Sequence, residues 1–190
     1  MNITQLPEGY QHIKTINLKS NKKYFIIVNV LSFAIMAVLV IIGLIIQPFP
    51  ISLSNRLANW PQALTIILSI FPFIVIHEMI HGILMYLFSK IKPHFGISWT
   101  YAYAGSKAYF KKIPYIIISS APVTIIGIIT LIANFLVSDS WFWVVYFIQI
   151  LNLSGAAGDI FVTATVLKLP SDILTIDSGT EMLIYSKTIN

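Results

Sequence analysis

Residues 64–89 read LTIILSIFPFIVIHEMIHGILMYLFS, and this stretch decides what kind of fold the chain adopts. It is long enough to cross a bilayer as a helix, because about 20 helical residues span roughly 30 Å of hydrocarbon. Yet His77, Glu78 and His81 place ionisable groups near its middle. Such groups are costly inside a membrane and mark functional sites by default. The stretch therefore predicts a membrane helix that carries a polar site.

The composition of the whole chain agrees with a membrane protein. Of its 190 residues, 57% are hydrophobic and 10% are charged, and the mean hydropathy is +0.83. Soluble domains carry about 25% charged residues. We expect one integral membrane domain over residues 1–190, and we interpret the net charge of +5 as a sign of orientation, with no nucleic acid as a partner. The absence of cysteine excludes disulfides and thiolate metal sites.

Four apolar stretches are long enough to span the membrane, at about residues 25–46, 63–88, 113–137 and 141–167. We expect all of them to be helices, because lipid offers no hydrogen-bond partner to an open backbone. The polar N-terminal residues 1–24 lack the apolar core of a secretory signal, so we expect them to be retained. The predicted fold is an all-α polytopic membrane protein with four transmembrane helices.

The basic residues predict how these helices are oriented. Lysines gather in the N-terminal segment and in the loop at residues 90–112, whereas the other two connections carry only Arg56 and Asp139. The positive-inside rule then places both termini and the 90–112 loop in the cytoplasm of a multi-pass protein of the cell membrane. We expect Trp60, Trp141 and Trp143 at the opposite interface, where aromatic side chains concentrate.

The 90–112 loop and the C-terminal tail contain strand patterns. Trp99, Tyr101 and Tyr103 alternate with small or polar residues, and AGSK at 104–107 predicts a turn into a second strand ending in AYF. The result is either an amphipathic hairpin resting on the membrane or an edge strand that binds an extended substrate through these aromatic residues. In the tail, DSGTEMLIY at 177–185 reads as a turn and a short strand. The tail forms a cytoplasmic cap, packs beneath the site, or pairs with the hairpin.

HEMIH at residues 77–81 has the spacing of a zinc site. Side chains four residues apart share one helix face, so His77 and His81 can direct both imidazoles at one Zn²⁺ ion. Glu78 can then reach a metal-bound water and act as general base and later as general acid. The alternative is a structural trio in which the histidines hydrogen-bond between helices.

Asp159 is the candidate for the third ligand, because it is the only carboxylate inside the fourth stretch. It precedes Lys168 by nine residues and His81 precedes Lys90 by nine, so both lie roughly 13 Å from the cytoplasmic end of their helices. Small residues at 155–158 either allow close helix packing or loosen the helix. The alternative for Asp159 is another polar contact, such as a pairing with Lys168.

Two further polar residues have open roles. Asn152 either hydrogen-bonds a substrate backbone or orients a ligand, or it joins two helices by a hydrogen bond. His94 lies in the soluble loop and reads as an ordinary surface histidine.

Together, HEMIHG, AYFKKIPYIIISSAPV, SGAAGD and LPSDILTIDSGTEMLIY resemble a family of small bacterial membrane proteins, the zincin peptidases, over about residues 76–185. The arrangement is also similar to site-2 proteases, the intramembrane zinc metalloproteases. That resemblance implies that His77, His81 and Asp159 ligate zinc, that Glu78 is catalytic, and that the 95–110 loop presents substrate as an extended strand. The chain departs from the site-2 pattern N-x-x-P-x-x-x-x-D-G, since Gly155 replaces the proline, Ile160 replaces the last glycine, and Asp159 follows Asn152 by seven residues.

The sequence thus favours an intramembrane zinc-dependent endopeptidase. Its expected substrate is a transmembrane segment of another membrane protein or a signal-peptide remnant, cut near the cytoplasmic leaflet. The alternative is a non-catalytic metal-binding scaffold or pseudoprotease, which the intact Glu78 disfavours. A metal or proton transporter is also disfavoured, because such proteins commonly have more spans and internal repeats.

Overall fold

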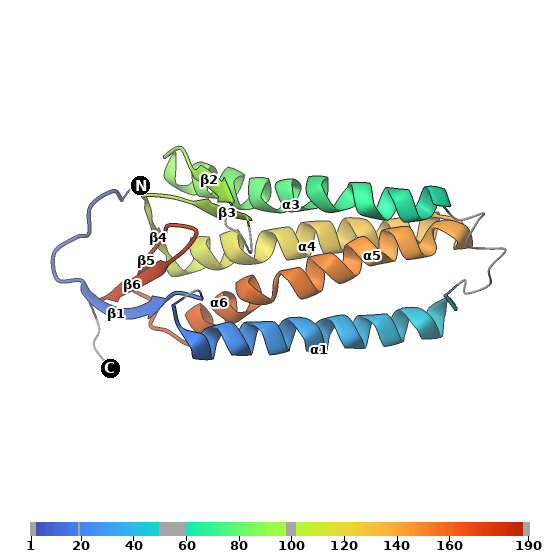
Figure 1. Ribbon diagram of the computed structural model, residues 1–190. Helices are drawn as coiled ribbons and strands as arrows, with labels where there is room; N and C mark the ends of the chain where they lie inside the picture. The colour runs from blue at the N-terminus through green and yellow to red at the C-terminus, as the bar shows by residue number, and fades with distance from the viewer. Residues whose placement is uncertain (1–2, 19, 50–59, 98–101, 188–190) are drawn as a thin grey trace.

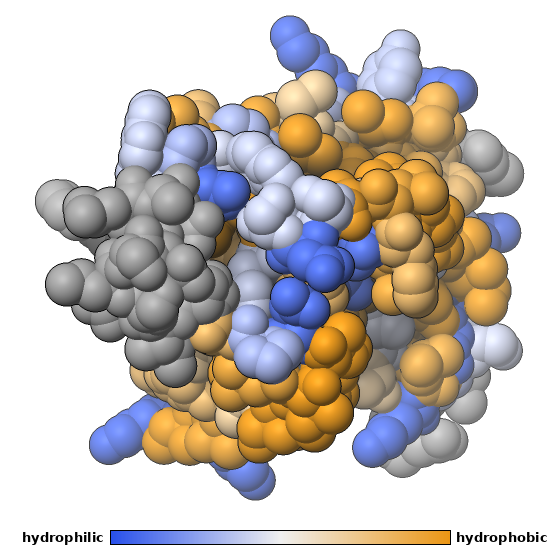
Figure 2. Space-filling model, turned by 90° about the vertical axis from the view of Figure 1, so that its right-hand side faces the viewer, coloured by the Kyte–Doolittle hydropathy of each residue, from blue (hydrophilic) through white to orange (hydrophobic). Residues whose placement is uncertain are grey.

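The computed structural model describes residues 3–18, 20–49, 60–97 and 102–187, and it is mostly helical. Long helices lie side by side, and the strands gather at one end of the bundle together with both ends of the chain (Figure 1). The helices are α1 (Lys22–Ile46), α3 (Trp60–Ser89), α4 (Lys112–Leu136), α5 (Asp139–Gly155) and α6 (Ala157–Leu167). Figure 2 looks onto the end opposite the strands, where apolar side chains lie to the right of and below a hydrophilic centre.

Three of the described helices, α1, α3 and α4, are long and apolar enough to cross a membrane. The count rises to four if α5 and α6 form one span, although these two helices meet at a bend of 43°. The sequence predicted a single helix at 141–167, so the break is a correction. Its physical reason is the run of small residues, where Ala156 leaves the helical conformation with φ −83° and ψ 16°.

The strands form more β-structure than the single hairpin that we predicted. β1 (Gln11–Ile16), β6 (Met182–Ser186), β5 (Leu174–Asp177) and β4 (Tyr109–Lys111) form an antiparallel sheet in that spatial order. β2 (His94–Ile97) and β3 (Ala102–Gly105) form a separate antiparallel pair, with Phe95 opposite Ala104. The predicted turn at 104–107 is wrong, because Ala104 and Gly105 lie within β3 and the following AYF segment enters β4 and pairs with β5.

The buried core lies where the four-stranded sheet packs against the helix ends. It draws on α3, α4 and α6 from the bundle and on β1, β4 and β6 from the sheet, through residues that include Ile16, Met85, Phe110, Tyr115, Ile118, Val166 and Ile184. Lys112 at the start of α4 ties this region to the end of α6, because its Nζ donates to the carbonyls of Leu167 and Leu169 at 2.9 and 2.5 Å. The sheet therefore fixes the strand-side ends of the helices that carry the polar site.

Candidate metal centre

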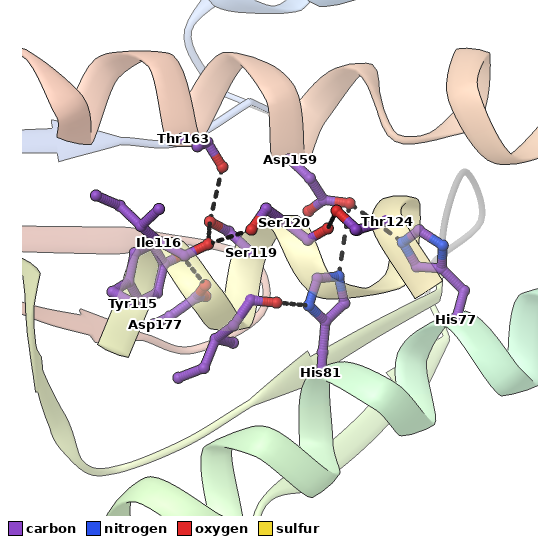
Figure 3. Close-up of polar contacts among 11 residues, drawn as sticks. His77, His81, Tyr115, Ile116, Ser119, Ser120, Thr124, Asp159, Thr163 and Asp177 are labelled. Carbon is purple, nitrogen blue, oxygen red and sulfur yellow. Dashed lines mark hydrogen bonds and ion pairs between the residues drawn. The ribbon is translucent and has the colours of Figure 1, made fainter. Parts of the chain in front are cut away.

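His77 and His81 project from α3 toward Asp159 of α6 (Figure 3). Oδ2 of Asp159 lies 3.1 Å from Nε2 of His77 and 3.5 Å from Nε2 of His81. Both histidines are buried, each with 8% of its surface exposed. One ligand-capable atom from each of the three residues lies within 4.8 Å of the others. The structure thus brings together the three residues that the sequence proposed as ligands, and Asp159 turns toward the histidines and away from the alternative partner, Lys168.

The break between α5 and α6 places Asp159 in the first turn of α6. Ala156 and Ala157 are almost fully buried, as close helix packing requires. Gly155, Ala157 and Gly158 line the cavity beside the site, and a Cβ added to Gly155 would meet nothing within 4 Å. This run of small residues therefore combines close packing with a break in the helix, the two alternatives that the sequence left open.

The second ring nitrogen of His81 has a fixed partner. Nδ1 lies 2.8 Å from the backbone oxygen of Ile118 on α4, and it must donate because a carbonyl only accepts. Nε2 then faces Asp159 as the free ligand atom. In contrast, Nδ1 of His77 is buried with no partner among the described residues. Two imidazole nitrogens and one carboxylate oxygen form a donor set that fits zinc, with a coordination position left over for water or substrate.

Glu78 lies beside the histidine pair, at the boundary of two cavities. The first cavity, of about 700 Å³, is lined by His77, Glu78, His81 and Asp159 and by parts of α1, β3 and the β5–β6 turn. The second, of about 620 Å³, is almost entirely apolar apart from Glu78. Ala104 on β3 lines the first cavity together with Glu78. Glu78 therefore shares these cavities with both the metal site and the hairpin.

The C-terminal tail forms one wall of the first cavity. Tyr115 donates from its hydroxyl to Oδ2 of Asp177 at 2.5 Å, and the Gly179 amide donates to Oδ1 at 2.7 Å. The Ser106 amide donates to the Asp177 carbonyl at 2.8 Å, which joins the turn to the chain just after β3. Burial raises the pKa of the Asp177 carboxyl. Sequence reasoning considered a tail beneath the site but missed Tyr115 and Asp177, because no local pattern links them.

The remaining residues that the sequence singled out do not share one setting. Asn152 is fully buried and its Nδ2 donates to the Val123 carbonyl on α4 at 2.9 Å, so it joins α5 to α4 and does not line the cavity. Tyr103 lines both cavities. Trp99 and Tyr101 lie outside the described residues. His94 is exposed and contacts the Ser178 carbonyl at 3.2 Å.

The comparisons with known proteins agree with this chemistry. A family model described as "Putative zincin peptidase" matches residues 70–174, which is more than half of the chain and includes the histidines, Glu78 and Asp159. The chain is also 34% identical over 118 residues to an "Uncharacterized 24.7 kDa protein in gap 5'region" from Pyrococcus woesei. That match covers 57% of this chain and 49% of the relative, so the chain spans about half of the relative's length. No solved structure matches the chain.

Proposed function

The chain belongs to this zincin peptidase family, which indicates metallopeptidase activity, and from that premise we propose an intramembrane zinc-dependent endopeptidase. The observation that carries the proposal is the convergence of His77, His81 and Asp159 on one point, with Glu78 beside them. These three residues would hold zinc. The helices that carry them are apolar along their length, which supports a site at membrane depth.

Glu78 performs the proton transfers of hydrolysis. Bound zinc supplies a Lewis acid that polarises the scissile carbonyl and acidifies water. The carboxylate of Glu78 takes a proton from the water as the water oxygen attacks the carbonyl carbon. When the carbon–nitrogen bond breaks, Glu78 delivers that proton to the leaving amine. The products are a free carboxylate and a free amine, so one water molecule is consumed per bond cut.

The substrate is a membrane-embedded segment or a signal-peptide-like remnant that has unwound near the site. Among the described residues β3 has one strand partner, β2. Its residues Ala102 and Tyr103 line both cavities, and Ala104 lines the first. An extended peptide paired with β3 would gain backbone hydrogen bonds in place of those lost on unwinding. The lysine distribution supports a cytoplasmic location for the strands and both termini, and hence cleavage near the cytoplasmic leaflet.

Metal content and cleavage can be measured on the same detergent-purified proteins. We expect near-stoichiometric zinc in the wild type and a large loss in His77→Ala and Asp159→Ala. Glu78→Gln should retain zinc and lose cleavage of a reporter transmembrane peptide. His12→Ala is the matched control, because His12 is an exposed histidine on β1, away from the site. Full zinc binding by Asp159→Ala would remove that residue from the site, and undiminished cleavage by Glu78→Gln would overturn the mechanism.

A further inference from the structure

Helix α4 contains a proline at a position that matters for the metal site. In an α-helix the carbonyl of each residue accepts a hydrogen bond from the amide four residues later. The residue four after Ile118 is Pro122, which has no N–H to donate. The helix nevertheless continues from Lys112 to Leu136, and Pro122 is fully buried. The Ile118 carbonyl is thus released from the regular pattern inside the bundle.

His81 occupies this released carbonyl. Its Nδ1 donates to the Ile118 oxygen at 2.8 Å, and Ile118 is itself almost completely buried. An unpaired carbonyl at membrane depth costs several kcal/mol, so the contact satisfies the backbone as well as the imidazole. The same bond fixes the protonated nitrogen of His81 and the orientation of its ring, which leaves Nε2 as the metal-binding atom.

The next residue of α4 contacts the helix that carries Asp159. The Ser119 hydroxyl lies 2.7 Å from the hydroxyl of Thr163, which follows Asp159 by one helical turn (Figure 3). Consecutive residues of α4 therefore touch both ligand-bearing helices. The Ile118 carbonyl orients a ligand from α3, and Ser119 contacts α6.

We propose that Pro122 is a positioning residue for the metal site, acting through the Ile118 carbonyl that it frees for Nδ1 of His81. The proposal rests on the zinc site proposed above. It distinguishes the two histidines: His81 is oriented before metal arrives, whereas Nδ1 of His77 has no partner among the described residues. Replacing Pro122 by alanine would restore an amide that competes with His81 for the carbonyl.

The chain offers a matched control in Pro72. It also lies inside a long helix, α3, and it frees the carbonyl of Leu68, whose side chain is mostly exposed on the outer face of the bundle. Pro72 lines neither cavity. Both substitutions replace a helix proline by a better helix former, but only Pro122→Ala affects a carbonyl that contacts a proposed ligand.

The test measures zinc affinity by chelator competition and the absorption spectrum of the cobalt-substituted protein in detergent. We expect Pro122→Ala to bind zinc about 10–100-fold more weakly, as for other partners of metal-ligating histidines. Its cobalt spectrum should also change, whereas Pro72→Ala should match the wild type. Wild-type affinity and spectrum in Pro122→Ala would overturn the proposal and leave the zinc site intact.

A second measurement needs no proline variant and therefore does not depend on its folding. Nitrogen NMR of histidine-labelled wild type, assigned by single substitutions among the four histidines, reports which ring nitrogen of His81 carries a proton. We expect a proton at Nδ1 in both the zinc-loaded and the metal-free protein. An unprotonated Nδ1 with the proton on Nε2 would refute the proposal. If the protein binds no zinc, the metal site fails, yet the metal-free spectrum still decides whether His81 is oriented in this way.

Discussion

Replacing Gly179 by alanine should lower the free energy of unfolding and displace Tyr103, which lines the cavity. Gly179 has a φ of +81°, and a Cβ built there would lie 2.2 Å from Cδ2 of Tyr103 and 3.0 Å from the Ala104 carbonyl oxygen. Gly9 provides the control, because it has the same φ of +81° but its nearest neighbour, Cε of Lys187, is 4.0 Å away. The two substitutions share backbone strain and differ in the steric clash.

The expected loss of stability follows from these two contributions. A left-handed conformation costs an L-residue about 1–2 kcal/mol, and this cost applies at both positions. Overpacking adds about 1–3 kcal/mol, and it applies only to Gly179→Ala. The free energy of unfolding should therefore fall by about 1–2 kcal/mol in Gly9→Ala and by about 2–5 kcal/mol in Gly179→Ala. The difference between them is the cost of moving Tyr103 and the backbone of β3.

Apparent melting temperatures in detergent and cleavage of a reporter peptide measure the two consequences. Tyr103 lines both cavities, so Gly179→Ala should lower kcat/KM as well as the melting temperature. Gly9→Ala should lower the melting temperature slightly and leave cleavage intact. Equal destabilisation by the two substitutions, with cleavage unchanged in both, would show that Tyr103 moves aside without cost and that the predicted clash is absent.

Three further predictions concern Asn152, the metal and Asp177. Asn152→Leu should lower the free energy of unfolding by about 1 kcal/mol through loss of the hydrogen bond to Val123, with cleavage retained; lost cleavage at an unchanged melting temperature would instead indicate substrate contact. Excess chelator should lower the melting temperature of the wild type but not of His77→Ala, because a ligand present at 100 times its Kd stabilises the folded state by about 2.7 kcal/mol. Burial raises the pKa of Asp177 in the folded state, so the folded state binds this proton more tightly than the unfolded state does. The contribution of that carboxyl to stability is therefore greatest below its unfolded pKa of about 3.9 and is lost as pH rises through the folded pKa. Melting curves of wild type and Asp177→Asn should diverge in this sense as pH rises, and a constant difference between the two would contradict it.

The arrangement of the candidate metal site, with His77, His81 and Asp159 close together, was the most predictable part of the molecule. The spacing of His77 and His81 along one helix is a local property. Asp159 was placed at the depth of His81 because each precedes a lysine, Lys168 or Lys90, by nine residues. Periodicity alone could not locate the bend in the fourth span, because a run of small residues is compatible with both a straight and a broken helix. The role of Pro122 was likewise invisible, since it depends on which helix faces the carbonyl that this proline releases.

The strands were harder to predict for a different reason. Their patterns are short, and the partners lie far apart in sequence, as for His12 of β1 opposite Tyr185 of β6. Alternation can indicate that a segment is extended, but it does not say which other segment completes its hydrogen bonds. The AYF segment illustrates this: it is extended as expected, yet Phe110 pairs with Thr175 in the tail and not with the neighbouring hairpin.

The order of the four-stranded sheet has a consequence for biosynthesis. β6, the last of the described strands along the sequence, lies between β1, the first of them, and β5. The edge of β5 can therefore be covered only after β6 has left the ribosome, and by then α1, α3, α4, α5 and α6 have been translated. The same tail supplies a wall of the cavity through Asp177 and Gly179. In an elongating or prematurely stopped chain, the cavity beside the histidine pair would therefore lack this wall.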